Sequence, residues 1–483
     1  MPRASGQDPS LPAPAGPGTG SGGRPPGDTR RNHILADENI GALLWKLSIP
    51  ATVGMAVMAT YNLVDAIFIG RGVGALGIGG LAIAFPLQLI VMSFGQLIGM
   101  GGASIISRAL GAGDEERASR TFGNVLTLVL IVAALITVSG LSFLDQIVRF
   151  FGATDEIAPY ATRYLSIILW GTAFRCYAMS HNNIIRSEGR ARIAMQTMII
   201  GAVTNIILDP IFIFGLDMGM RGAAAATVIA QGCSTTYIIL YFTLGSTSLS
   251  LRLRDLRPVR LIVREILAVG AASFGRMVGG SALVIVMNHS LGHYGGNVAI
   301  AAYGLIHRLL QFLFMPIIGF GQALQPVAGF NYGARQFARS KRAMRISVIR
   351  STAFSVGAFI ILMALPYPLV RLFTRDQELI ELAASSLRIV ALAFPVIGIQ
   401  MMGAVMFQAF GRAAHALFLT LSRQIIFLIP LVLILPRFFH LDGIFWSFPA
   451  ADVLATAITV LMLVREFARL DRKEEAAVAS SGR

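Results

Sequence analysis

The chain has few charged residues for its length. Asp, Glu, Lys and Arg make up 13% of its 483 residues, whereas 55% are hydrophobic. A soluble globular domain carries about 25% charged residues. Most of the surface must therefore face something other than water, which predicts a protein embedded in a lipid bilayer. The net charge of +15 does not indicate nucleic-acid binding, because the arginines lie in short clusters between hydrophobic runs.

Cysteine and lysine are also scarce. Cys176 and Cys233 lie in apolar surroundings and show neither disulfide nor metal spacing. None of the three lysines follows a glycine, so the chain has no GxxxxGK[ST] phosphate-binding loop, and it has no HExxH zinc motif. We therefore expect no cofactor and no enzymatic activity. Any transport would draw its energy from an ion gradient or from a partner.

The first 33 residues are rich in proline, glycine and serine, and they contain no long apolar run. Such a composition cannot bury a core, so we expect residues 1–40 to form a disordered cytoplasmic tail. No apolar run precedes Leu43, and a signal peptide is not expected.

Twelve apolar stretches follow, each near the roughly 20 residues that a membrane-crossing helix needs. They cover about residues 44–67, 80–106, 122–144, 160–184, 192–215, 222–245, 262–288, 298–320, 348–370, 384–409, 414–436 and 442–464. Arginine is abundant in every second connection, including Arg252, Arg254 and Arg257, and sparse in the others. Because positive charge prefers the cytoplasmic side, we predict that both termini face the cytoplasm.

A two-fold repeat relates the halves of the chain at an offset of 222 residues. The segment 183–191 aligns with 405–413, and Gly111-Ala112 pairs with Gly333-Ala334. Many secondary transporters are built from such repeats. We therefore expect an all-α membrane protein of two six-helix lobes, related by a pseudo-two-fold axis near the membrane normal. The lobes would cover 41–245 and 262–466, with a cytoplasmic linker at 246–261 and a cytoplasmic tail at 467–483.

Two acids, Asp65 and Asp209, lie within predicted spans of the first half. A charged Asp at a helix centre costs about 2.5–3.5 kcal/mol on insertion scales, so intramembrane acids are usually functional. Asn205 is four residues before Asp209 and shares its helical face. Pro210 leaves the carbonyl of Ile206 without its usual donor. This stretch predicts an oxygen-rich site for a proton or a cation. Alternatively, Asp65 lies at the outer interface, or Asp209 only caps a kinked helix.

We expect the second half to contribute polar residues but no acid in the middle of a span. Its candidates include His307 and Gln311, and an embedded Arg308 would need a partner. In the first half, Tyr61 and Asn62 lie one turn before Asp65. Met58 belongs to a methionine stripe that could line a pliable pocket or could simply be core. These side chains are the candidates for a substrate cavity: Met58, Tyr61, Asn62, His307 and Gln311.

Several spaced motifs resemble the multidrug and toxic compound extrusion (MATE) family. The residues that carry the resemblance are Asn205 to Pro210, Gly222 to Thr227, Tyr61 to Asp65, and Gly329 to Ala334. The similarity runs from about residue 40 to 465 and is greatest with the prokaryotic branch that includes the DNA-damage-inducible members. By position, the resemblance implies a coupling-ion site in the N-terminal lobe. That site comprises Asp65, Asn182, Asn205, Asp209 and Thr227, and Asn183 is an alternative to Asn182.

The resemblance also implies a function and a location. It implies a multidrug exporter of the bacterial inner membrane, which exchanges drug-like organic compounds, namely cations or amphiphiles, for H⁺ or Na⁺. No nucleic acid, metal or cofactor is implied beyond a possible Na⁺, and we expect a monomer in the lipid bilayer. A flippase for lipid-linked oligosaccharide or peptidoglycan precursors is the alternative, because Arg175, Arg276 and Arg308 could serve a pyrophosphate.

Overall fold

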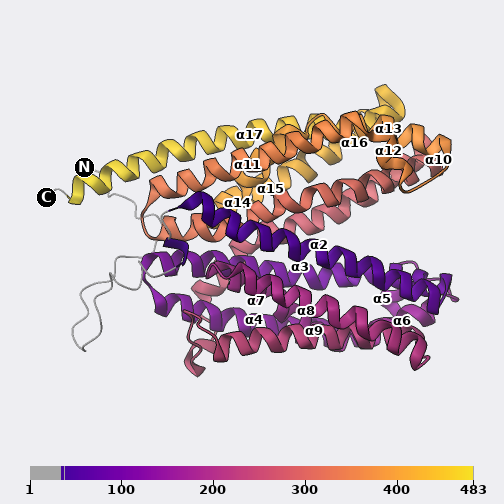
Figure 1. Cartoon of the computed structure of the whole chain (residues 1–483), viewed down its shortest axis with the longest axis horizontal. Coiled ribbons are helices and arrows are strands. Elements are labelled where there is room, and N and C mark those ends of the chain that lie inside the picture. Colours follow the sequence, from indigo (N-terminus) through magenta and orange to yellow (C-terminus); the bar gives the residue numbers. More distant parts are fainter. Residues whose placement is uncertain (1–33, 37–38, 482–483) are drawn as a thin grey trace. The chain divides into compact units, whose positions relative to one another are not determined.

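The computed structural model describes residues 34–36 and 39–481, and within them every regular element is a helix (Figure 1). Most of the expected N-terminal tail lies outside the described residues. The first half contains η1 (Ile34–Ala36), α2 (Ile40–Gly72), α3 (Ala75–Ala112), α4 (Glu115–Ser142), α5 (Leu144–Phe150), α6 (Ala158–Trp170), α7 (Thr172–Ser187), α8 (Ala191–Pro210), η2 (Ile211–Gly215) and α9 (Gly219–Leu244). The rest contains η3 (Leu253–Leu256), α10 (Arg260–Gly333), α11 (Phe337–Ala364), α12 (Pro366–Arg371), α13 (Gln377–Ala391), α14 (Phe394–Ala409), α15 (Ala413–Leu421), η4 (Ser422–Leu428), α16 (Ile429–Ile434) and α17 (Pro436–Ser481).

The helices account for the twelve expected spans. Within the described residues, nine helices are long and apolar enough to cross a bilayer, and the bent pair α13–α14 makes ten. Helix α10 has 74 residues, about 110 Å at 1.5 Å per residue, which is far more than one crossing needs. Its backbone leaves the helical region at Gly296 (φ 64°), so it forms two spans. Helices α6 and α7, interrupted at Gly171, supply the twelfth.

The repeat in the sequence is also a repeat in the structure. Helices begin at equivalent residues, 222 positions apart, in both halves: Glu115 and Phe337, Thr172 and Phe394, Ala191 and Ala413. Two glycines in the left-handed backbone conformation are also 222 residues apart: Gly189 (φ 80°) just after α7 and Gly411 (φ 75°) just after α14. Glycine commonly ends helices in this conformation because it carries no Cβ. The two halves therefore use the same turns to end and restart their helices.

The chain divides into two compact units. Unit 2 comprises Ile49–Ala103 and Ser119–Phe274, and unit 1 comprises the remainder, including Ser104–Ala118 and everything from Gly275 onward. Helix α3 therefore begins in unit 2 and ends in unit 1. In unit 1, Ser104 Oγ donates a hydrogen bond to the carbonyl of Gln408 over 2.6 Å. A Cβ at Gly411 would lie 2.6 Å from the guanidinium of Arg108, so a larger residue there would displace this side chain.

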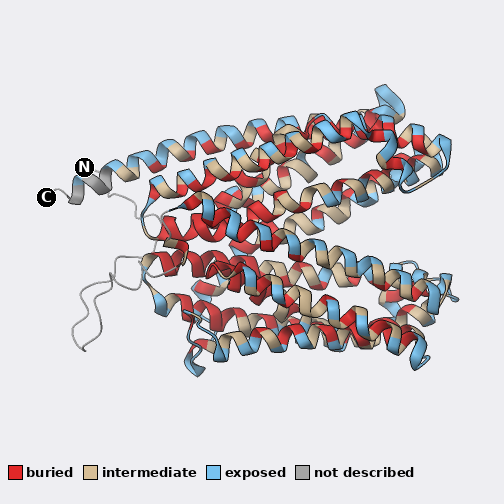
Figure 2. Ribbon diagram, viewed as in Figure 1, coloured by how far each residue is buried: buried red, intermediate tan, exposed pale blue. Residues whose placement is uncertain are grey.

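In unit 2, α9 packs on α6, α7 and α8. Its buried residues include Gly222, Ala223 and Ala224. Small residues of this kind allow helices in a membrane to approach closely. Buried and exposed residues mix along the helices in Figure 2. The exposed ones include large apolar side chains, such as Leu135 at 64% and Val138 at 65% of full exposure in α4. Such apolar surface fits contact with lipid.

Two connecting segments differ from simple linkers or tails. Residues 246–261, expected as the linker, contain η3 and belong to unit 2 together with α4. Helix α17 does not stop at the end of the last span but continues to Ser481. In this extension, Asp471 forms an ion pair with Lys341 of α11, and Lys473 lies 5.7 Å from the ring centre of Tyr332.

Candidate functional site

Helices α2 and α8 each place one carboxyl group inside unit 2. Asp65 on α2 is 7% exposed, and Asp209 at the end of α8 is 0% exposed. Pro210 follows Asp209, and the backbone then changes to the π-helical segment η2. Proline lacks the N–H that a regular helix would use, and π-helical turns frequently occur at functional sites. The local sequence therefore ends the regular helix directly beside the acid.

Asn205 connects Asp209 to α9. Its Nδ2 donates to Oδ1 of Asp209 over 3.2 Å and reaches Oγ1 of Thr227 over 3.5 Å. The hydroxyl of Thr227 donates in turn to the carbonyl of Ala223 over 3.0 Å. All three side chains are buried. The structure thus brings together Asn205, Asp209 and Thr227, as the sequence predicts.

Asp65 completes this cluster from α2, because its side chain lies in hydrogen-bonding contact with that of Asp209. Asp65 is therefore buried beside a second acid, and Asp209 contacts a side chain of another helix as well as Asn205 of its own. An ionised carboxylate can only accept a hydrogen bond. Two carboxylates this close repel each other when both are ionised, so such a pair favours a proton or a cation between them.

Three buried oxygen atoms of the cluster accept no hydrogen bond from the described residues: Asp65 Oδ1, Asp209 Oδ2 and Asn205 Oδ1. Buried polar atoms normally find a partner. Their arrangement fits a proton, and it also fits a small hard cation, which takes oxygen ligands. No group of three or more His, Cys, Asp or Glu residues that could hold a metal ion occurs among residues 34–36 and 39–481.

Asn182 does not join this cluster. Its Nδ2 donates to the carbonyl of Ala194 over 2.8 Å and to Oγ1 of Thr197 over 2.6 Å. Thr197 precedes Asn205 by eight residues on α8, about 12 Å along the helix axis. The neighbouring Asn183 donates to Gln96 instead. In this structure the amide of Asn182 fastens α7 to α8, which corrects its expected place among the ion ligands.

The candidates for a substrate cavity are distributed over both units. Tyr61 and Met58 are half-buried on α2, whereas Asn62 is exposed there. Tyr61 lies within electrostatic range of Asp65 and Asp209. His307 and Gln311 are exposed on α10 in unit 1. A shared cavity for these residues therefore stays a prediction.

Sequence reasoning missed a polar chain beside the acids in unit 2. Arg175 Nη1 donates to Oε1 of Gln88 over 3.2 Å, and Gln88 Nε2 donates to the hydroxyl of Tyr164 over 3.4 Å. Both Arg175 and Tyr164 lie within electrostatic range of Tyr61. The sequence does indicate these contacts, because Arg175 lies in the middle of the expected span 160–184, where a charged side chain needs a partner.

The expectation that no acid lies in mid-span in the second half is wrong. Asp452 lies within the expected span 442–464, is 3% exposed, and pairs with Arg423. Arg423 Nη2 donates to Oδ2 of Asp452 over 3.2 Å, and the guanidinium lies 5.8 Å from the ring centre of Phe314. The membrane tolerates this acid because an opposite charge meets it. The first-half acids do not recur, since the same offset places Met287 and Leu431 at their positions.

Fold and site together define an integral membrane protein of twelve spans with a buried acidic cluster in its first half. The MatE family model matches residues 50–211 and 274–434. The chain belongs to this family, as the sequence motifs predicted.

Relatives of known structure and name agree with this family. Multidrug export protein MepA of Staphylococcus haemolyticus (strain JCSC1435) is 28% identical over 428 residues, which cover 88% of this chain and 94% of that one. The structure of the MATE multidrug transporter DinF-BH in complex with R6G is 45% identical, covers 88% and 95% of the two chains, and superposes with a TM-score of 0.82. A MATE structure in complex with MaL6 is 27% identical, with 92% and 98% coverage and a TM-score of 0.85.

Proposed function

We propose that the chain is a secondary active multidrug exporter, which expels organic cations and amphiphilic compounds in exchange for protons. The observation that carries this proposal is the contact between the carboxyl groups of Asp65 and Asp209 inside unit 2. The names of its relatives support the substrate class, since one is a multidrug export protein and another binds R6G.

The acid pair is the coupling device in this proposal. With a proton between them, Asp65 and Asp209 carry one negative charge fewer, and α2 and α8 are held together at this point. When the proton leaves, two like charges face each other in a poorly hydrated site, which favours separation of the helices or the arrival of a cation. Uptake of a proton from outside then discharges the organic cation.

We assign the coupling ion as H⁺ and keep Na⁺ as the alternative. A proton fits between two carboxyl groups that are already in contact, whereas a sodium ion would require their oxygen atoms to move apart. Asn205 and Thr227 keep Asp209 in place in either case. Asn182 lies on α7 and supports α8, the helix that carries Asp209, and its partner Thr197 lies about 12 Å along α8 from Asn205.

The proposal includes an orientation and a location. The arginine-rich connections predict that both termini face the cytoplasm of a bacterial inner membrane. We also propose that the protein acts as a monomer. The flippase alternative has less support, because the guanidinium of Arg175 donates to Gln88 instead of standing ready for a pyrophosphate.

The test is efflux of a fluorescent organic cation from vesicles with separately imposed pH and sodium gradients. We expect a pH gradient alone to drive efflux, and Asp209→Asn and Asp65→Asn each to abolish it. Asp217→Asn is the matched control, because Asp217 is exposed and has φ 50°, a conformation that Asn also tolerates. Efflux driven by sodium alone would assign the other ion, and normal efflux by both acid variants would refute the coupling site.

A further inference from the structure

The segment between α9 and α10 combines strong positive charge with exposed apolar side chains. Residues 246–264 contain five arginines and one acid. That acid, Asp255, is buried, and it lies 3.8 Å from Nε of Arg254. Between the arginines, Leu253 is 88% exposed and Leu261 is 72% exposed. Arginines alternating with exposed leucines are typical of segments that lie at the surface of a membrane.

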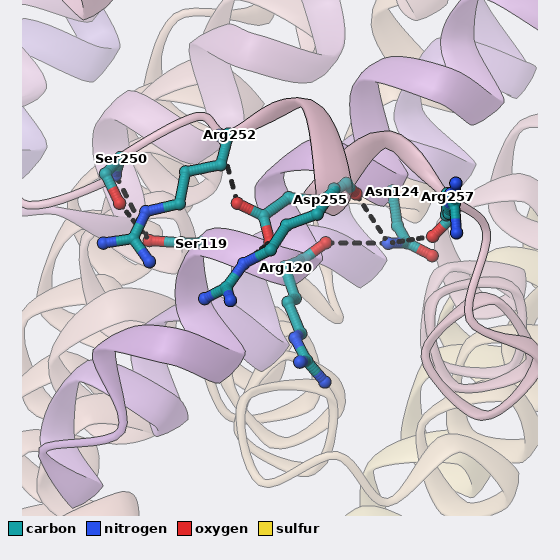
Figure 3. Close-up of polar contacts among 8 residues, drawn as sticks. Ser119, Arg120, Asn124, Ser250, Arg252, Asp255 and Arg257 are labelled. Atoms are coloured by element: carbon teal, nitrogen blue, oxygen red, sulfur yellow. Dashed lines mark hydrogen bonds and ion pairs between the residues drawn. The ribbon is translucent and has the colours of Figure 1, made fainter.

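Buried polar contacts hold this segment on α4. Asn124 Nδ2 donates to the carbonyls of Asp255 and Arg257 over 3.2 and 3.3 Å (Figure 3). Its Oδ1 accepts from the backbone N–H of Val259 over 2.7 Å. Thr127 Oγ1 donates to the carbonyl of Leu256 over 2.7 Å. Hydrogen bonds from α4 thus hold the backbone of the segment, while the arginine side chains of the segment remain exposed.

Further contacts fix the beginning of the segment. The backbone N–H of Ser250 donates to Oγ of Ser119 over 3.2 Å (Figure 3). Glu188, 3% exposed, accepts from the hydroxyl of Thr247 and from the backbone N–H of Ser248 over 2.8 and 2.7 Å. The segment is therefore a strap attached along its length to unit 2, and its arginines form a fixed array.

A shallow, open depression lies where the strap meets α10, and its lining is Pro258, Arg260, Val263, Arg264, Leu267 and Ala268. Arg260 and Arg264 lie one helical turn apart and are exposed. Apolar side chains of the same helix face form the rest of the lining. Two cations beside an apolar wall at the end of a membrane span match an anionic headgroup with its acyl chains.

We propose that the strap and the first turns of α10 bind anionic phospholipid of the cytoplasmic leaflet. Arg257, Arg260 and Arg264 meet the phosphate groups, and the exposed leucines enter the interfacial layer. The choice of leaflet rests on the orientation proposed above, whereas binding itself does not depend on export. Charge decides the occupant, since a zwitterionic headgroup would leave the cluster of arginines without counter-charge.

The test measures lipid binding to the purified full-length chain. Dioleoyl-phosphatidylglycerol and dioleoyl-phosphatidylcholine are titrated into the protein in detergent, and retained lipid and Tm are recorded. Each arginine near an anionic surface contributes about five-fold in affinity. We therefore expect the triple change Arg257→Gln, Arg260→Gln and Arg264→Gln to weaken phosphatidylglycerol binding roughly a hundred-fold, and the same triple change to Lys to retain most of it.

A matched control removes the same charge from unit 1. Arg335→Gln, Arg342→Gln and Arg345→Gln affect three exposed arginines around the start of α11. They also lie in an arginine-rich connection, so we expect some loss of lipid binding, but a clearly smaller loss than in the strap variant. Equal loss in this control, or no loss in the strap variant, would overturn the proposal. Equal stabilisation by the soluble headgroup glycerophosphoglycerol would show that no lipid is needed and would also overturn it.

Discussion

Replacing Asn124 by Ala should detach the strap from α4. The side chain of Asn124 is fully buried and makes three hydrogen bonds to the strap backbone, with Asp255, Arg257 and Val259. A fourth, to the carbonyl of Arg120 over 2.8 Å, stays within α4. Alanine removes all of them and leaves the N–H of Val259 without its acceptor.

The size of the effect follows from the number of bonds. An intramolecular hydrogen bond contributes about 1 kcal/mol net, and an unsatisfied buried group costs about 1–3 kcal/mol. The two hydrogens of Nδ2 serve three carbonyls, including that of Arg120, so the strap receives the equivalent of about two bonds, or about 2 kcal/mol against local opening. With a factor of ten for every 1.4 kcal/mol, amide exchange in the strap should become roughly 30-fold faster. Thr127→Val removes one bond, to Leu256, and should give about a five-fold change.

Hydrogen–deuterium exchange with peptide-level readout measures this directly. We expect peptides from residues 246–261 to lose protection in the Asn124→Ala protein, while those from α11 keep wild-type rates. Unchanged protection of 246–261 would refute the reasoning that these buried bonds hold the strap. A uniform loss over all peptides would also refute it, since the predicted opening is local.

Three further changes are predicted. Asp209→Asn keeps an oxygen that accepts from Asn205, so the free energy of unfolding should change by no more than about 1 kcal/mol. Dye efflux in vesicles should nevertheless be lost. Burial raises the pKa of the Glu188 carboxyl above its ordinary 4.5, although its hydrogen bonds act in the opposite direction. The folded protein therefore binds the carboxyl proton more tightly than the unfolded chain, and stability falls as pH rises from 4.5 through the raised pKa. Glu188→Gln should remove this part of the dependence of Tm on pH. Asp452→Asn leaves the partly buried Arg423 without its partner and should lower the free energy of unfolding by about 3 kcal/mol. In thermal unfolding, the double variant with Arg423→Gln should lose less stability than the sum of the two single variants.

The sequence predicted most of the fold because bilayer thickness, charge distribution and the repeat constrain it independently. Helix restarts at Glu115 and Phe337 share the 222-residue offset, so the alignment indicated the boundaries of both halves. The break at Gly296 inside α10 was expected from length alone, since one span cannot use 74 residues. The helical extension of α17 to Ser481 was not foreseen, because its contacts with Lys341 and Tyr332 join segments distant in the chain.

The site was only partly predictable. Spacing places Asn205 and Asp209 on one face, but the contact with Asp65 depends on how α2 packs against α8, which one sequence does not show. Asn182 was assigned by position in a family motif, and its actual partner, Thr197, could not be inferred from spacing within α7. Asp452 was visible in the sequence, and its pairing with Arg423 crosses from α17 to η4.

Counting the protons released when an organic cation binds tests the central claim most directly. Purified protein in weakly buffered detergent solution is mixed with the cation, and a pH indicator records the release. We predict about one proton per bound cation for the wild type, because the Asp65–Asp209 pair holds one, and none for Asp209→Asn. Binding without release in the wild type, or equal release by the variant, would contradict the account.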